Sequence, residues 1–199
     1  MYIARILYPV KVLGPGERIG IWFAGCRHKC PGCSNPELWE FAGKYRTSLE
    51  VVMDLIKRVA AEHPIDGFTI TGGEPFEQPE ELVRLLKQLT CYSEDILIYT
   101  GYEYAEVSRR YPAVMELAGA LIDGRYLKEQ NHGSILRGSD NQQLTIIKEQ
   151  LRGGYETFLA APENKIQNFM TTDGMISVGI HQPGFMEQLD RAVKEKGLI

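Results

Sequence analysis

Three cysteines lie close together in the segment Gly25–Ser34 (GCRHKCPGCS). Cys26, Cys30 and Cys33 have the spacing C-x3-C-x2-C, and the fourth cysteine of the chain, Cys91, is distant in sequence. A loop of this length can direct three thiolates at one iron–sulfur cubane and leave the fourth iron without a protein ligand. An iron with an open position can bind a substrate, so the pattern indicates chemistry more than structural support.

Zinc is the alternative metal for this loop. A structural zinc site takes four ligands, commonly from two C-x2-C pairs or from a mixture of cysteine and histidine. Only Cys30 and Cys33 have the paired spacing, although His28 could complete a set of three cysteines and one histidine. A non-catalytic zinc-binding interaction module therefore stays open as a function of another class. For Cys91, which ends a helical stretch, we expect a buried and unreactive thiol.

A second motif, TGGEP, follows the β-rich run Gly67–Thr71. Ligands of α/β sheets bind beyond the carboxyl ends of the strands. Gly72 and Gly73 let the backbone approach a ligand closely, and Glu74 offers an acceptor at the same rim. A Gly-Gly pair after a strand is by itself usually only a turn. The TGGEP motif indicates a binding site because of its position: it and the cysteine loop should lie at the same edge of the sheet.

The elements that must position these motifs alternate between strands and helices. Apolar spacing and β-branched residues predict strands at residues 19–24, 67–71, 96–100, 120–123 and 144–148. A capping box at Thr47–Glu50 predicts a helix that ends at His63, and Pro79 begins a second helix with a leucine stripe. A third helix is predicted at residues 103–110. This alternation favours a parallel α/β sheet, curved into an incomplete barrel.

The pattern changes after Gly153-Gly154. A strand is predicted at Phe158–Ala160, a hairpin at Ile166–Ile180 with its turn at Asp173, and a closing helix from Pro183 onward. We therefore divide the chain into a core of residues 1–150 and a C-terminal extension of residues 151–199. The extension is expected to pack on the core rather than to form a separate domain.

Composition excludes several classes of protein. The 199 residues suffice for one domain with a full core. A net charge of −4 gives no electrostatic reason for nucleic-acid binding, and no apolar run is long enough for a membrane span. The first residues do not have the pattern of a signal peptide. We therefore expect a cytoplasmic protein, in which thiols stay reduced and available to metal rather than forming disulfides.

The two motifs together resemble the radical S-adenosylmethionine (SAM) superfamily. Similarity to the small activating enzymes of glycyl-radical enzymes extends over Gly14–Arg18 (GPGER), Phe23–Cys26 (FAGC) and Cys30–Asn35 (CPGCSN). Three later motifs resemble the activating proteins of anaerobic (class III) ribonucleotide reductases: Tyr99–Tyr102 (YTGY), Leu121–Tyr126 (LIDGRY) and Arg137–Gln142 (RGSDNQ). The resemblance runs from about Tyr8 to Gln142.

The resemblance implies a fold, two cofactors and a reaction. The fold is an α/β partial (open) β/α barrel of the radical SAM type, and Cys26, Cys30 and Cys33 would ligate one [4Fe–4S] cluster. The methionine part of SAM would chelate the fourth iron. An electron from the reduced cluster would break SAM into methionine and a 5′-deoxyadenosyl radical, which would take a hydrogen atom from a backbone glycine of a partner. The protein would supply geometry and exclude water and oxygen.

Further site residues follow from the resemblance. The methionine amino group would be held by Gly72, Gly73 and Glu74. Gly32 and Ser34 would touch the adenosyl part through their backbone. Many radical SAM proteins have a bulky residue before the third cysteine, whereas Gly32 agrees with the reductase-activating proteins. No catalytic residue is expected beyond these ligands of the cluster and of SAM.

Three polar residues follow later strands and could contact the ribose or a carboxylate: Thr100, Asp123 and Ser139. Helix capping or a turn is the alternative role for each of them. Arg125 and Arg137 could pair with a ligand carboxylate or lie solvated at a rim, and for Arg137 we favour the pairing. His28 and Lys29 are expected to face solvent or a partner.

The implied partners are a glycyl-radical enzyme, namely the large subunit of anaerobic ribonucleotide reductase, and a low-potential electron donor such as flavodoxin or ferredoxin. Nucleic acid and membranes are not expected as partners. An alternative within the same chemistry is another glycyl-radical enzyme, or a peptide or small-molecule substrate chosen by the extension. Compact activating proteins can end soon after the Arg-Gly-Ser region. The additional residues of this chain could complete the sheet, cover SAM or dock a partner.

Overall fold

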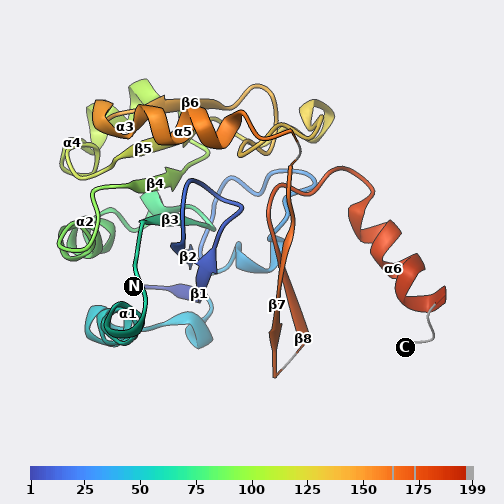
Figure 1. Cartoon of the computed structure of the whole chain (residues 1–199), viewed down its shortest axis with the longest axis horizontal. Helices are drawn as coiled ribbons and strands as arrows, with labels where there is room; N and C mark the ends of the chain where they lie inside the picture. The colour runs from blue at the N-terminus through green and yellow to red at the C-terminus, as the bar shows by residue number, and fades with distance from the viewer. Residues whose placement is uncertain (163, 173, 196–199) are drawn as a thin grey trace.

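The computed structural model describes residues 1–162, 164–172 and 174–195. Six strands form one sheet in sequence order (Figure 1): β1 (Ile3–Val10), β2 (Arg18–Phe23), β3 (Gly67–Gly72), β4 (Ile96–Tyr99), β5 (Ala120–Asp123) and β6 (Gln143–Ile146). Strands β2 to β5 are parallel, whereas β1 and β6 pair antiparallel with their neighbours. The predicted parallel arrangement is thus correct for the four central strands and wrong for β6, and the strand at the other edge, β1, was not predicted.

Strand β1 was not predicted because its pattern is not that of a strand with one buried face. Six consecutive residues of β1, from 4 to 9, are half-buried, and only Ile3 and Val10 are buried. Pro9 also interrupts the run, and proline within a strand is tolerated mainly at a sheet edge. The position of β1 beside β2 gives it that edge.

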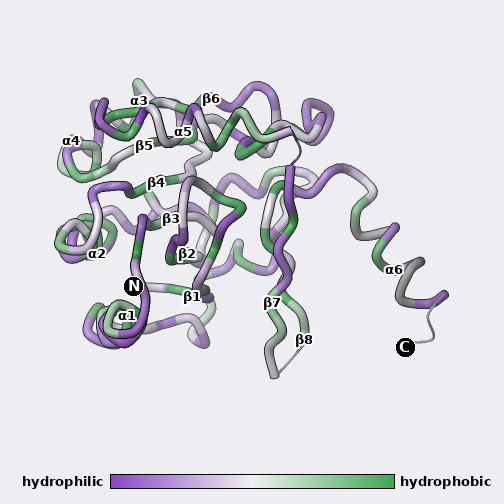
Figure 2. Tube along the Cα trace, in the orientation of Figure 1, coloured by the Kyte–Doolittle hydropathy of each residue, from purple (hydrophilic) through white to green (hydrophobic). Residues whose placement is uncertain are grey.

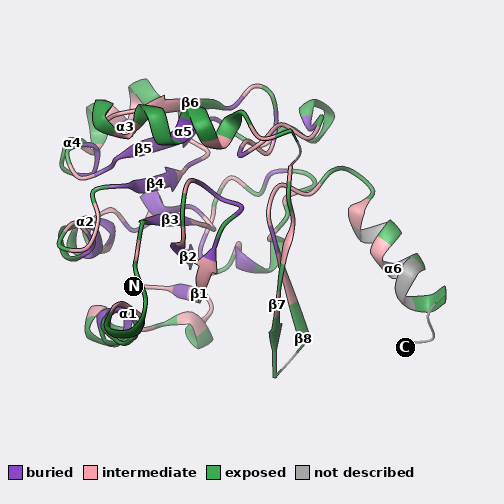
Figure 3. Ribbon diagram, in the orientation of Figure 1, coloured by how far each residue is buried: buried purple, intermediate pink, exposed green. Residues whose placement is uncertain are grey.

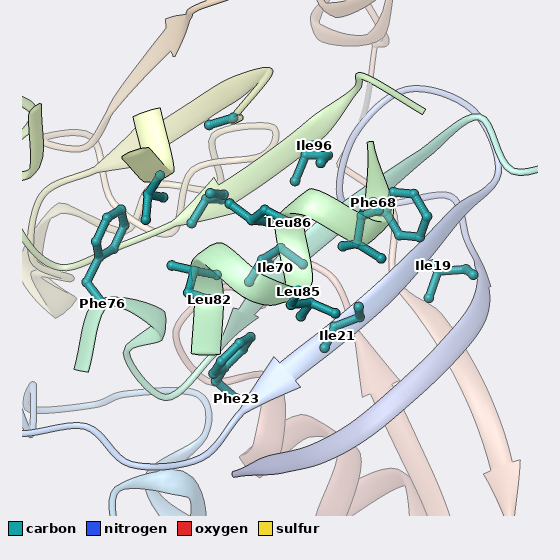
Figure 4. Packing of buried hydrophobic residues seen from close by; sticks show 14 of the residues in the cluster. Ile19, Ile21, Phe23, Phe68, Ile70, Phe76, Leu82, Leu85, Leu86 and Ile96 are labelled. Carbon is teal, nitrogen blue, oxygen red and sulfur yellow. The ribbon is translucent and has the colours of Figure 1, made fainter. Parts of the chain in front are cut away.

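Helices cover one face of the sheet (Figure 1): α1 (Leu49–Glu62), α2 (Pro79–Leu89), α3 (Tyr104–Arg110) and α4 (Pro112–Met115). The core on this face combines alternate residues of the strands, such as Ile19, Ile21 and Phe23, with the apolar stripe of α2 (Figure 4). Buried residues of α1 belong to the same core. Helix α2 carries both hydrophobic and hydrophilic residues (Figure 2). The predicted leucine stripe is confirmed, since all four of its leucines are buried.

Helix α1 begins one residue later than the capping box predicts. The side chain of Ser48 accepts a hydrogen bond from the Val51 N–H at 3.4 Å and is the N-cap. The backbone N–H of Thr47 instead donates to the carbonyl of Met1 at 3.0 Å. Pairing with the N-terminal segment therefore moves the cap from Thr47 to Ser48. The predicted end at His63 and the start of α2 at Pro79 are confirmed.

The opposite face of the sheet is covered by α5 (Arg152–Leu159) and by a separate hairpin of β7 (Gln167–Thr171) and β8 (Gly174–Val178). The hairpin is confirmed, although the Asp173 at its predicted turn lies outside the described residues. Its outer residues are exposed, in contrast to the buried central strands (Figure 3). The helix α6 (Phe185–Glu195) follows, as predicted.

The strand predicted at Phe158–Ala160 is wrong, because these residues belong to the end of α5 and its cap. Leu151, Tyr155 and Phe158 have helical spacing and pack together on the sheet. Gly153 and Gly154 lie within the helix and do not break it. Packing of an apolar stripe has outweighed their poor helix propensity.

A buried ionic network joins α5 to the amino ends of the strands. The side chain of Arg18 is fully buried and donates to Asp95 Oδ2 at 2.6 Å and to Thr69 Oγ1 at 2.8 Å. The Tyr155 hydroxyl donates to Asp95 Oδ1 at 2.7 Å. Burial raises the pKa of Tyr155, so it remains a hydrogen-bond donor. A buried guanidinium requires such a counterion and full pairing of its donors.

Five short 3-10 helices complete the described elements: Pro36–Leu38, Gly43–Tyr45, Pro75–Glu77, Lys128–Gln130 and Glu149–Leu151. None of the helices in the described part of the chain is long and apolar enough to cross a lipid bilayer.

Candidate active site

One cavity of about 200 Å³ lies at the carboxyl ends of the parallel strands. Its lining includes residues that follow each of these strands: Cys26 after β2, Gly73 after β3, Thr100 after β4 and Gly124 after β5. This is the edge at which α/β sheets bind their ligands. The cysteine loop and the Gly-Gly-Glu motif therefore meet there, as the sequence predicts.

All three cysteines of the loop line this cavity. Burial raises the pKa of the Cys26 and Cys33 thiols, while backbone N–H groups of His28 and Lys29 act in the opposite direction on Cys26. The backbone N–H of Asn35 donates to Cys33 Sγ at 3.4 Å. Such N–H···S contacts favour the thiolate, which is the form that ligates metal. The loop thus provides three sulfur ligands at one cavity.

His28 does not complete a zinc site in this arrangement. Its Nε2 atom lies 3.3 Å from Glu74 Oε2, within ion-pair distance but not aligned as a hydrogen bond. Its ring packs edge-on to Tyr102, with 4.6 Å between centroids. Among the described residues, no three Cys, His, Asp or Glu side chains surround one point as ligands of a single metal ion. Three cysteines at one cavity, with the histidine engaged elsewhere, have the ligand chemistry of a cubane whose fourth iron has no protein ligand.

The expectation that His28 faces solvent is wrong, because its side chain is only 15% exposed and lines the cavity. Its contact with a partner stays a prediction. Gly101 makes room for the imidazole, since a Cβ atom at this position would lie 2.7 Å from His28 Cδ2. Lys29 does face solvent, where its ammonium group lies 3.1 Å from Glu40 Oε1.

Glu74 connects the ends of β3 and β4 through a buried carboxylate. Oε1 accepts hydrogen bonds from the Thr100 hydroxyl at 2.9 Å and from the Phe76 N–H at 3.0 Å. Oε2 accepts from the Gly101 N–H at 2.7 Å. The carboxylate is therefore paired within the protein and orients the neighbouring strand ends. Backbone of Gly72 and Gly73 lines the cavity, and their contact with the methionine amino group stays a prediction.

Gly73 lets the end of β3 approach the cysteine loop closely. A Cβ atom at Gly73 would lie 2.6 Å from the carbonyl oxygen of Gly25, the residue before Cys26. The Gly73 N–H donates to the Phe23 carbonyl at 2.7 Å, and the Glu74 N–H donates to the Gly25 carbonyl at 2.8 Å. The absent side chain thus makes room for the protein's own backbone, whereas the sequence suggested room for a ligand.

Comparison with known proteins agrees with this site. Residues 12–145, more than half of the chain, match the family model "4Fe-4S single cluster domain". The chain is 32% identical over 143 residues to the anaerobic ribonucleoside-triphosphate reductase-activating protein of Enterobacteria phage T4, covering 69% of this chain and 90% of that protein. The proteins of the same name from Escherichia coli K12 and Vibrio cholerae are 31% identical over 149 residues and 33% identical over 150; each comparison covers 68% of this chain and 92% of the relative.

The chain belongs to the family of anaerobic ribonucleoside-triphosphate reductase-activating proteins. This confirms the resemblance found in the sequence and the prediction of a [4Fe–4S] cluster. The family therefore favours the enzyme over the zinc-binding interaction module. The family model ends at residue 145, so α5, the hairpin and α6 lie beyond the matched region.

Of the other site residues that the family resemblance implies, Thr100 and Ser34 line the cavity. Asp123, Ser139 and Gly32 are not among its lining residues. Asp123 Oδ2 accepts from the Tyr104 N–H at 2.8 Å, at the start of α3, and Ser139 Oγ accepts from the Leu127 N–H at 3.1 Å. Asp123 thus caps the first turn of α3, whereas Ser139 joins two segments of the loop after β5, and the contacts of both with SAM stay predictions.

Two arginines hold loops of the activating-protein core. Arg125 donates to the carbonyl of His28 at 2.6 Å and so supports the cysteine loop. Arg137 donates to the carbonyls of Asp140 and Gln142 within its own loop and is not among the residues that line the cavity. Cys91 is exposed, so the expectation of a buried thiol is wrong.

Several lining residues were missed by the sequence analysis. Trp22 and Tyr99 line the cavity from strands β2 and β4. Trp22 lies between Ile21 and Phe23, so the two-residue period of the strand would have placed it on the face opposite the helices. Residues 177–181 of the C-terminal extension also line the cavity. No local pattern in the sequence links those residues to the cysteine loop.

Proposed function

We propose that this chain activates an anaerobic ribonucleoside-triphosphate reductase by generating a glycyl radical on it, with a [4Fe–4S] cluster and SAM as cofactors. The proposal depends on one observation above all. Cys26, Cys30 and Cys33 line a single cavity together with Gly72–Glu74, in a chain of the activating-protein family. The relatives carry the name of this activity.

Each part of the cavity has a role in this reaction. When bound, the cluster and SAM supply the electron and the 5′-deoxyadenosyl radical that removes a hydrogen atom from the partner's glycine. The three cysteines would hold three irons of the cluster, and the backbone of Gly72 and Gly73 would bind the methionine amino group. Glu74 keeps the ends of β3 and β4 in register. Apolar walls, including Trp22, limit the access of water.

We also propose that the sheet is the open β/α barrel of the radical SAM type. Four parallel strands, separated by segments that contain helices, support this fold. The cavity at their carboxyl ends supports it as well, because barrel enzymes place their sites there. The first 150 residues would form this barrel, and residues 151–199 would be an addition packed on it.

The partners follow from the chemistry. The large subunit of the reductase is the glycyl-radical enzyme, and a low-potential donor such as flavodoxin or ferredoxin supplies the electron. We place the reaction in the cytoplasm because the ligand thiols must stay reduced. Neither nucleic acid nor a membrane takes part in it.

The test is anaerobic reconstitution of the protein with iron and sulfide, followed by addition of SAM, a reductant and the reductase. We expect bound iron, release of 5′-deoxyadenosine and an electron-spin-resonance signal of a glycyl radical in the reductase. If the protein binds iron but leaves SAM uncleaved, the proposal that it is a radical SAM enzyme is refuted. SAM cleavage without a radical in the reductase would refute this target and favour another glycyl-radical enzyme or a peptide or small-molecule substrate.

A further inference from the structure

Five consecutive residues of the C-terminal extension, 177–181, line the same cavity as the three cysteines. Ser177 and Val178 end β8, and Gly179, Ile180 and His181 follow it. These residues lie beyond the region that matches the family model, which ends at residue 145. The extension therefore contributes a wall to the cavity that the matched core does not contain.

The hairpin is fixed on the core by contacts from two sides. Val178 is 3% exposed and packs in one cluster with Leu13 and Trp22. The side chain of Gln167, on β7, accepts from the Lys11 N–H at 3.0 Å and donates to the Pro9 carbonyl at 2.6 Å. These contacts bind the hairpin to β1 and β2. A wall that is already held in place loses little conformational entropy when a ligand binds.

The second side is the loop that follows β5. Asn131 donates to the carbonyl of His181 at 2.8 Å and to the Tyr126 hydroxyl at 3.2 Å. Tyr126 also lines the cavity. Asn131 thus connects the residue after the hairpin to a side chain of the core at the same site.

A polar pair stands within this wall. Ser177 Oγ and His181 Nε2 are 2.8 Å apart, and the imidazole packs on the Phe185 ring with 4.3 Å between centroids. Partial burial lowers the pKa of His181, which favours the neutral imidazole at neutral pH. A hydroxyl has one donor and two acceptor positions, so Ser177 keeps hydrogen-bonding capacity after it has bonded to His181.

We propose that Ser177 and His181 bind the nucleoside half of SAM through hydrogen bonds to its ribose hydroxyls. This inference rests on the proposed function. The methionine half belongs beside the cysteine loop and Gly73, so the ribose needs polar partners elsewhere in the cavity. Of the three residues for which the sequence predicted such contacts, Asp123 and Ser139 are not among the lining residues. Thr100 does line the cavity, but its hydroxyl already donates to Glu74 Oε1 at 2.9 Å and accepts from the Tyr102 N–H at 3.1 Å. Ser177 and His181 both line the cavity and bond mainly to each other.

The affinity for SAM tests this role without turnover. The reconstituted protein, without reductant, is titrated with SAM under anaerobic conditions as wild type, Ser177→Ala and His181→Ala. Loss of one hydrogen bond to the ligand should raise Kd about three- to tenfold. In the double variant Kd should rise by less than the product of the two single-variant factors, because the two side chains share one hydrogen bond.

Two matched controls lie outside the cavity lining. Thr171→Ala removes an exposed hydroxyl of the same hairpin, which donates to the Gly174 carbonyl at 2.9 Å. His132→Ala removes an exposed imidazole that is bonded to Asp140 at 2.7 Å. Both variants should bind SAM like the wild type. Iron content and circular dichroism show whether each variant is folded, and if His181→Ala is not, the smaller change Ser177→Ala decides.

A second ligand identifies which half of SAM is bound. 5′-Methylthioadenosine contains the nucleoside but no amino acid, and its affinity is measured by competition with SAM. We expect Ser177→Ala to weaken both ligands by the same factor. Unchanged SAM affinity in folded Ser177→Ala protein, or weaker SAM with unchanged methylthioadenosine, would overturn the inference. A wild type that binds neither iron nor SAM would instead overturn the proposed function.

Discussion

Replacing Gly73 with alanine tests how the Gly-Gly-Glu motif supports the cysteine loop. The new Cβ atom would lie 2.6 Å from the carbonyl oxygen of Gly25, so one backbone segment has to move away from the other. Two hydrogen bonds join these segments, from Gly73 N–H to Phe23 and from Glu74 N–H to Gly25. Weakening both should cost about 2 kcal/mol of the free energy of unfolding. For a chain of this size, Tm should fall by about 4–8 °C.

The assay compares iron per chain and Tm of Gly73→Ala with those of the wild type and of Gly43→Ala. Gly43 is the matched control, because a Cβ atom there would meet nothing within 4 Å. We expect less bound iron and a lower Tm only in Gly73→Ala, since Cys26 follows the displaced Gly25. Full iron content and an unchanged Tm, with weaker SAM binding alone, would refute this reasoning. That result would indicate that the missing side chain of Gly73 makes room for the ligand and not for the Gly25 backbone.

The other predictions concern single side chains of the site and of the core. Cys26→Ala, Cys30→Ala and Cys33→Ala should each lose the iron–sulfur absorbance, whereas Cys91→Ala should keep it; iron loss in the Cys91 variant would contradict the ligand assignment. In Glu74→Gln an amide nitrogen replaces one acceptor oxygen and leaves a buried donor unpaired, so thermal unfolding should show a Tm lower by about 4–8 °C. Tyr155→Phe removes one hydrogen bond to Asp95 and should lower Tm by about 2–4 °C with unchanged SAM affinity.

Features that depend on neighbouring residues could be predicted from the sequence. The cysteine spacing and the TGGEP motif are continuous in sequence, and both reach the expected edge of the sheet. The leucine stripe of α2 is equally local, because its four leucines follow the helical period. In each case the residues that form the feature are close together in the sequence, so a sequence pattern can reveal it.

Features that depend on distant contacts were missed or misassigned. Arg18 entered the sequence analysis only as the last residue of the GPGER motif, yet it is buried against Asp95, which is far away in sequence. The same carboxylate anchors Tyr155, and this contact helps to explain why α5 is a helix where a strand was expected. The pairing of β1 with β2 likewise has no local signal. A local sequence pattern cannot show which distant residue each of these residues contacts.

The cysteine loop itself is held mainly by partners outside it. Arg125, which follows β5, bonds to the carbonyl of His28, while Glu74 and Gly101 surround the imidazole of the same residue. The backbone of Gly25 is bonded to Glu74 after β3. The ends of three neighbouring strands thus fix a loop whose sequence alone would allow many shapes. Because the same segments line the cavity proposed for SAM, loss of bound iron and weaker SAM binding should occur together when these segments are disturbed. Ser177 and His181, in the extension, take no part in the contacts that hold the cysteine loop. Variants at these two residues can therefore show weaker SAM binding without loss of iron.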